Sequence, residues 1–172
     1  IREIAKIIKN FNKNIIFHTD ACQAAGHLDI GMEKLSVDLM TVSGAKIYGP
    51  KGGGFLYKRE GVKLAPQIYG GEQEFGFRAG TEPIAQIVGL AKAFEISVLE
   101  RNDENNRLKE LRDYFADSII KNIKNAEING DLEKRIPSNL SVSFFGHESE
   151  ALIIAFDEKG IAVSSGSACD SK

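Results

Sequence analysis

Short apolar runs that end in polar side chains limit the fold of this chain more than any other feature. Residues 14–21 read NIIFHTDA, residues 37–44 read VDLMTVSG, and residues 52–60 read GGGFLYKRE. Runs of this kind are typical of buried strands, and in a parallel sheet their polar ends gather at the carboxyl edge. Because helical patterns alternate with these strands, we predict an α/β fold with short loops.

Helical periodicity fills much of the remaining sequence. The first helix is predicted to bury one apolar face, made of Ile4, Ile7, Ile8 and Phe11. Residues 23–36 are expected to form a helical turn and a connector. The longest periodic segment, residues 82–123, is interrupted by the polar stretch RNDENN, so it is either one long helix or two helices with a hinge.

The second half of the chain has the pattern of a small α+β domain. Strands are predicted over AEINGD, NLSVSFF and GIAVSS, with a helix over HESEALIIAFDEKG between the last two. We therefore place a domain boundary inside the long helical segment, which gives domains 1–100 and 101–172. The chain starts with Ile1 rather than Met and stops just past a glycine-rich loop, so we expect both ends to be cut from a longer chain.

Composition and charge argue against several functional classes. A net charge of −2 and a pI near 6.0 argue against a nucleic-acid-binding surface. No apolar run approaches the roughly 18 residues that span a membrane, and we expect no signal peptide. The two cysteines, Cys22 and Cys169, make no disulfide framework, which favours the cytoplasm. There is no CxxC or HExxH pair to suggest a metal site.

Two lysines lie in the stretch SGAKIYGPKGGG, residues 43–54, where the second predicted strand meets a loop. A phosphate loop of the GxxxxGK[ST] type is excluded, because no Ser or Thr follows a lysine here. Lys51 is interpreted as a solvated turn residue. Lys46 lies at the end of a strand, where a lysine can form a Schiff base with an aldehyde cofactor.

Pyridoxal phosphate is the cofactor that fits the neighbouring residues. It acts as an electron sink when a carboxylate keeps its pyridine nitrogen protonated, and Asp20 ends the first predicted strand. Gln23, one helical turn further on, could hydrogen-bond the phenolic oxygen, and Ser43 could bind the phosphate. We expect Asp20 and Lys46 to lie at the same edge of the sheet.

Four motifs in order resemble one known family. HTDACQAAG, SGAKIYGPKGGG, FRAGTEP and SSGSACDS are similar to the motifs of class V aminotransferase-like cysteine desulfurases of the NifS/IscS group, and the resemblance runs over the whole chain. It implies a fold-type I pyridoxal-phosphate enzyme. Residues 1–100 would form part of its large, mostly parallel-sheet domain, and residues 101–172 part of its small α+β domain.

The resemblance also implies roles for individual residues. Lys46 matches the internal aldimine lysine, Asp20 the pyridinium partner, Gln23 the ligand of the phenolic oxygen and Ser43 a phosphate ligand. Thr81 matches a threonine that reaches the cofactor phosphate of the neighbouring subunit, which implies a homodimer.

The implied reaction converts L-cysteine to L-alanine. Cys169 matches the nucleophile that takes the sulfur as a persulfide and passes it to an iron–sulfur scaffold or a tRNA-thiolation protein. Cys22 is interpreted as a small buried hydrophobe. Ala45 stands where the family often has histidine, which removes one donor near the phosphate.

Two alternatives stay open from the sequence. A selenocysteine lyase-type relative is one, although such enzymes tend to use a different cysteine loop. An inactive folding or dimerisation fragment is the other, because the cofactor-stacking histidine and the carboxylate-binding arginine of the family are not among these residues.

Overall fold

The computed structural model describes residues 1–166, which fall into two compact units. The first unit runs from Ile1 to Arg107 and the second begins at Leu108. Each unit is considered by itself. The domain boundary between residues 100 and 101 stays an interpretation of the sequence.

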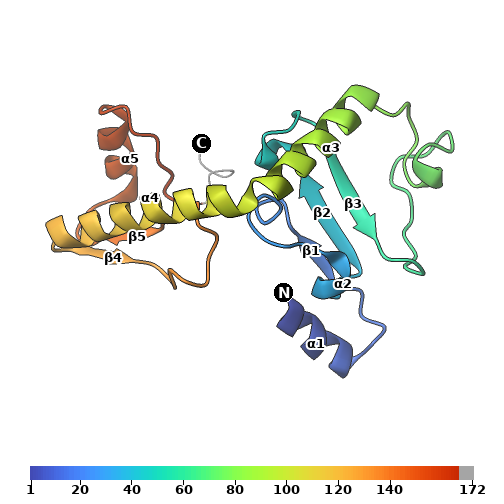
Figure 1. The fold of residues 1–172 in the computed structure, drawn as a ribbon, viewed down its shortest axis with the longest axis horizontal. Coiled ribbons are helices and arrows are strands. Elements are labelled where there is room, and N and C mark those ends of the chain that lie inside the picture. Colours follow the sequence, from blue (N-terminus) through green and yellow to red (C-terminus); the bar gives the residue numbers. More distant parts are fainter. Residues whose placement is uncertain (167–172) are drawn as a thin grey trace. The chain divides into compact units, whose positions relative to one another are not determined.

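A three-stranded sheet forms the centre of the first unit (Figure 1). Strands β1 (His18–Asp20), β2 (Leu39–Ser43) and β3 (Gly54–Lys58) lie in that order. β1 and β2 are parallel, and β3 runs antiparallel to β2. The link between β2 and β3 is too short for the crossover that a parallel pair needs. The three predicted strands and the α/β class are confirmed.

The first unit also contains several helical elements. They are α1 (Arg2–Phe11), α2 (Met32–Leu35), the 3₁₀ turns η1 (Gly44–Ile47) and η2 (Glu74–Gly76), α3 (Ile84–Leu99) and the start of α4 (Arg101–Asn122). The long periodic segment is thus two helices that meet at Glu100, as one of the two predicted alternatives had it. No helix of the described part of the chain is long and apolar enough to cross a membrane.

One face of the sheet is buried and the other is more open. Met40 and Val42 of β2 are almost fully buried and pack with Ala21, Ala25 and Leu90 in the main core cluster. Their neighbours in the strand point to the opposite face, because side chains alternate along a strand. That face carries His18 and Asp20, which are exposed.

Helix α1 forms as predicted, but its apolar face is not buried. Ile4, Ile7 and Phe11 are 50%, 69% and 85% exposed, Ile8 is half-buried, and only Ala5 of this helix is fully buried. The helix is attached instead through a polar contact, since Lys9 Nζ lies 2.5 Å from Asp38 Oδ2. Periodicity predicts that a helix is amphipathic, and it does not say what covers the apolar side.

Asp38 joins several segments of the first unit. Its side chain is 5% exposed and accepts hydrogen bonds from Lys9 at 2.5 Å and from the backbone N–H of Phe17 at 2.8 Å. The Arg59 guanidinium lies 3.4 Å from its other oxygen. Burial works to raise the pKa of Asp38, but these hydrogen bonds and the two positive charges outweigh it and hold the pKa below its usual value.

The second unit contains the rest of α4, strands β4 (Ala126–Ile128) and β5 (Val142–Phe144), which pair antiparallel, and helix α5 (Ser149–Asp157). The buried side chains of α4 are Arg112, Ala116 and Ile119. The predictions of a strand over AEINGD, a strand over NLSVSFF and the helix between residues 147 and 160 are therefore confirmed.

The predicted strand over GIAVSS is wrong. Residues 160–165 form no ladder, and Gly160 has a φ of 74°. The N–H of Gly160 donates to the carbonyl of Asp157 at 2.8 Å, and the N–H of Ile161 to the carbonyl of Phe156 at 2.9 Å. This is the Schellman pattern of a helix end, so the first backbone donors of the segment serve α5.

Candidate functional site

The carboxyl ends of β1 and β2 bring three of the predicted residues to one edge of the sheet. Asp20 ends β1 and pairs in register with Thr41 of the parallel strand β2. Ser43 ends β2, and Lys46 follows in η1. Asp20 and Lys46 are exposed and Ser43 is half-buried. The parallel pairing makes the two strand ends coincide, as the sequence predicted for Asp20 and Lys46.

Cys22 lies between the ends of β1 and β2 and contacts residues of both strands. Its N–H donates to Asp20 Oδ1 at 2.8 Å, and its Sγ lies 3.9 Å from the carbonyl oxygen of Thr41. Burial raises the pKa of the Cys22 thiol, and the hydrogen bond and negative charge of Asp20 raise it further. The backbone of Ser43 and the charge of Lys46 act in the opposite direction. The charges of Asp20 and Lys46 therefore both influence the Cys22 thiol.

Asp20 is held in its ionised form by the same neighbour. Hydrogen bonds from the side chain and the backbone of Cys22 lower the pKa of Asp20, while burial and the charge of His18 have smaller effects. Cys22 is half-buried rather than the buried hydrophobe that the sequence suggested, because its thiol belongs to this polar edge. An ionised carboxylate is the form that can partner a protonated pyridine nitrogen.

Gln23 lies on the turn that follows β1. The N–H of Ala21 donates to the carbonyl of Thr41 at 2.9 Å, which continues the β1–β2 pairing into this turn. Ala21 and Ala25 are buried in the core, whereas Gln23 is exposed. The turn thus has a methyl side that packs inward and a polar side that carries Gln23.

Close backbone packing holds the η1 loop that carries Lys46. A Cβ on Gly44 would lie 3.0 Å from both the Gly53 carbonyl oxygen and Leu90 Cδ1 of α3. A Cβ on Gly89, also on α3, would lie 2.5 Å from Pro50 Cγ. Neither position has room for a side chain. These two glycines belong to the architecture of the site, and the sequence argument did not identify them.

The donor set at this edge fits pyridoxal phosphate. The cofactor requires an amine for its aldehyde, a carboxylate for its ring nitrogen and neutral donors for its phosphate. The edge offers Lys46, the ionised Asp20 and the Ser43 hydroxyl. Ser43 precedes η1, but its side chain makes no cap hydrogen bond to that turn within the described residues.

Two predicted residues are not brought to this edge. Thr81 lies just before α3, is exposed and follows Gly80, which has a φ of 109°. Within residues 1–166, no hydrogen bond joins Thr81 to Asp20, Ser43 or Lys46. Cys169 lies outside the described residues. Lys51 is exposed, in line with the interpretation of a turn residue.

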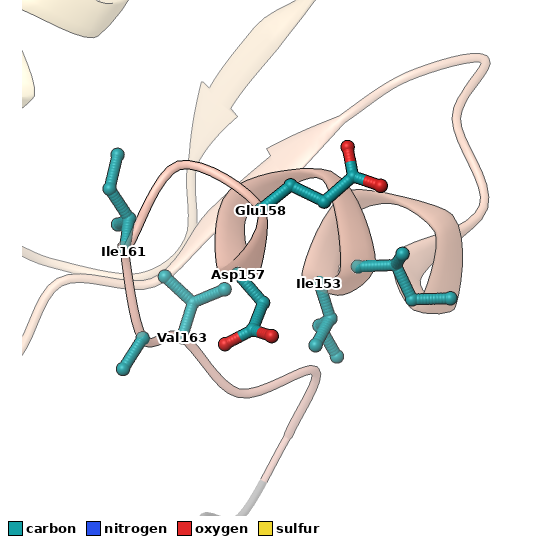
Figure 2. A pocket seen from close by; sticks show the side chains of 7 residues that line it. Ile153, Asp157, Glu158, Ile161 and Val163 are labelled. Atoms are coloured by element: carbon teal, nitrogen blue, oxygen red, sulfur yellow. The ribbon is translucent and has the colours of Figure 1, made fainter.

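A pocket of about 280 Å³ lies in the second unit. Its lining comes from α5 and the segment that follows it: Ile153, Ile154, Asp157, Glu158, Ile161, Ala162 and Val163 (Figure 2). Most of these side chains are aliphatic, and none of the predicted catalytic or cofactor-binding residues is among them. The sheet edge of the first unit is therefore the better candidate for chemistry.

Comparison with known proteins shows the family to which this chain is related. The sequence model of the family Aminotransferase class-V matches residues 1–171. The chain is 46% identical over 171 residues to the cysteine desulfurase IscS of Dictyoglomus turgidum, covering 99% of this chain and 43% of that protein. It is 44% identical to cysteine desulfurase IscS 1 of Archaeoglobus fulgidus, covering 100% of this chain and 44% of that protein.

Solved structures show the same relationship. A NifS-like protein superposes with a TM-score of 0.90 at 37% identity, over 96% of this chain and 45% of that one. The NifS-like protein of Rickettsia africae superposes with a TM-score of 0.88 at 32% identity, with the same coverage of 96% and 45%. The chain thus spans less than half the length of the relatives it matches.

Proposed function

Because the chain belongs to the aminotransferase class V family, we propose that the whole protein is a pyridoxal-phosphate-dependent cysteine desulfurase. The observation that carries the proposal is the shared sheet edge, where β1 ends at Asp20 beside the parallel strand β2, and Lys46 follows the end of β2 in η1. Relatives at 46% and 44% identity bear the name cysteine desulfurase, which disfavours an inert fragment or a selenocysteine lyase-type relative.

Residues of this chain would hold the cofactor from one side. Lys46 would bind its aldehyde carbon through the ε-amine, and Asp20 would keep its ring nitrogen protonated. Gln23 would bind the phenolic oxygen, and Ser43 the phosphate. When bound, pyridoxal phosphate supplies an electron sink that weakens the bonds next to the substrate's α-carbon.

Lys46 and Cys169 would carry the chemical steps on L-cysteine. The Lys46 amine would take the proton from the substrate's α-carbon and later return it to the same carbon. The Cys169 thiolate attacks the substrate sulfur, and the carbon–sulfur bond breaks with its electron pair on carbon. Protonation of that carbon, together with return of the proton to the α-carbon, gives L-alanine, and Cys169 keeps the sulfur as a persulfide.

The partners follow from this chemistry. A protein persulfide needs an acceptor, and we propose an iron–sulfur scaffold or another sulfur-acceptor protein. We further propose a homodimer in which Thr81 binds the phosphate of the cofactor in the second subunit. The absence of a disulfide framework from the sequence favours a reducing compartment, the cytoplasm.

Borohydride trapping tests the assignment of the lysine. Reduction of the whole protein with its cofactor should fix the cofactor covalently on Lys46. The Lys46→Ala variant should lose the trapped cofactor and the release of sulfide from L-cysteine, whereas Lys51→Ala should keep both. Trapping on Lys51, or equal trapping in both variants, would refute the site. Turnover of selenocysteine but not of cysteine would favour the lyase.

A further inference from the structure

A side-chain amide holds the turn that follows β1. Asn105, on α4, donates from Nδ2 to the carbonyl oxygen of His27 at 2.7 Å, and its Oδ1 lies 2.9 Å from His27 Nδ1. Both contacts are partly buried and close a separation of 78 positions. Since the carbonyl can only accept, Nδ2 must face it, and His27 then donates from Nδ1 to Oδ1.

The turn behaves as one hydrogen-bonded segment. The N–H groups of Ala24 and Ala25 donate to the carbonyl of Ala21 at 3.0 Å, and those of His27 and Leu28 donate to the carbonyl of Ala24 at 2.9 and 2.8 Å. A displacement at His27 is therefore passed along the backbone to the start of the turn.

Both ends of this segment matter for the candidate site. At its start, the N–H of Cys22 donates to Asp20, and Gln23 follows on the exposed side. Its inward side is made of the buried side chains of Ala21 and Ala25, and the start of the turn is fixed to β2 by the Ala21 N–H, which donates to the Thr41 carbonyl at 2.9 Å. Directional contacts at the far end come from Asn105.

We propose that Asn105 is a positioning residue for the cofactor. It fixes the turn of residues 21–28 by its far end and so sets where Asp20 and Gln23 meet the pyridine ring. This inference rests on the proposed function. Asn105 lies in the polar stretch RNDENN, which signalled only an interruption of a helix in the sequence.

The next residue provides a matched control. Asn106 is the same residue type on the same helix, is exposed and forms no hydrogen bond with the turn within the described residues, so Asn106→Ala should leave the site unchanged. Asn105→Ala removes both hydrogen bonds. Asn105→Asp keeps the shape and the acceptor for His27 Nδ1 but replaces the donor that faces the His27 carbonyl with an oxygen.

The experiment measures pyridoxal phosphate binding to the whole protein prepared without cofactor. Asn105→Ala and Asn105→Asp should each raise Kd about tenfold, which corresponds to about 1.4 kcal/mol. They should also shift the pH midpoint of the visible absorption band of the bound cofactor. Amide hydrogen exchange of residues 21–28 should rise in the cofactor-free variants. Asn106→Ala should match the wild type in all three measurements.

Several outcomes would overturn the inference. If Asn105→Ala lowers only the midpoint of urea unfolding and leaves Kd and the absorption band unchanged, Asn105 is structural. If Asn105→Asp binds like the wild type, side-chain volume rather than hydrogen bonding is what counts. If the wild type binds the cofactor and both Asn105 variants bind it equally well, the positioning role is refuted and the proposed function is not. A wild type that binds no cofactor refutes the proposed function with it.

Discussion

Asp38 illustrates how one buried residue holds the first unit together. Its carboxylate receives Lys9 from α1, the N–H of Phe17 before β1 and the charge of Arg59 after β3. Replacing it by Asn keeps an acceptor for Phe17 but leaves both cations without their charge partner. We expect Asp38→Asn to lower the free energy of unfolding of the whole protein by about 3 kcal/mol at pH 7, measured by urea unfolding.

The pH dependence of this loss follows from the pKa of Asp38. Because that pKa is lowered in the folded protein, the stabilisation is fully present above the unfolded value of about 3.9. It is lost as the pH falls through the folded value. The difference between the wild type and Asp38→Asn should therefore shrink below about pH 4. Asp29 provides the control, since its ion pair with Lys34 is exposed and Asp29→Asn should change little. Equal effects of the two substitutions would contradict the account.

Among the elements, we expect the contact between the η1 loop and α3 to fix the position of Lys46. Helix propensity predicts that Gly89→Ala stabilises α3 by about 1 kcal/mol. The contact predicts the reverse, because the new Cβ would lie 2.5 Å from Cγ of the rigid Pro50 ring. We expect Gly89→Ala to destabilise the protein by about 1–3 kcal/mol and to weaken cofactor binding. Urea unfolding and cofactor titration measure the two effects.

A second substitution tests whether this clash is the cause. Pro50→Ala removes the Cγ and Cδ atoms that the new Cβ would meet at 2.5 and 3.1 Å. Gly89→Ala should therefore cost much less in the Pro50→Ala background than in the wild type, as a double-mutant cycle would show. A stabilising Gly89→Ala, or additive effects of the two substitutions, would show that α3 moves aside freely.

For the molecule as a whole, local patterns predicted most of the elements and the sheet edge of the candidate site. Asp20 and Lys46 could be placed together because parallel strands end at the same edge of a sheet. The exposure of Ile7 on α1 could not be predicted, because periodicity identifies the apolar face of a helix but not the residues that pack against it. The contact between Asn105 and His27 could not be predicted either, since a hydrogen bond over 78 positions leaves no local signal. Apart from the helix end at Gly160, where a strand was predicted, what the sequence missed are long-range contacts.

The proposed role of Thr81 in the partner's site can be tested in the assembled dimer. Thr81→Ala alone should weaken cofactor binding whether the threonine serves its own subunit or its neighbour, so mixed dimers are needed. We expect subunits with Lys46→Ala and subunits with Thr81→Ala, unfolded and refolded together, to regain activity. If Thr81 serves the neighbouring subunit, each mixed dimer has one site with both residues intact and one with neither. Random mixing then restores roughly a quarter of the wild-type sites.

The opposite arrangement gives a different result. If Thr81 serves its own subunit, every site in the mixed dimer lacks one of the two residues, and the mixture cannot exceed the average of its parents. The wild type refolded alone gives the reference, and size-exclusion chromatography verifies that dimers have formed. Recovery above the parental average therefore requires both a two-fold dimer and a site shared across it, and a mixture at the average would remove Thr81 from the partner's site.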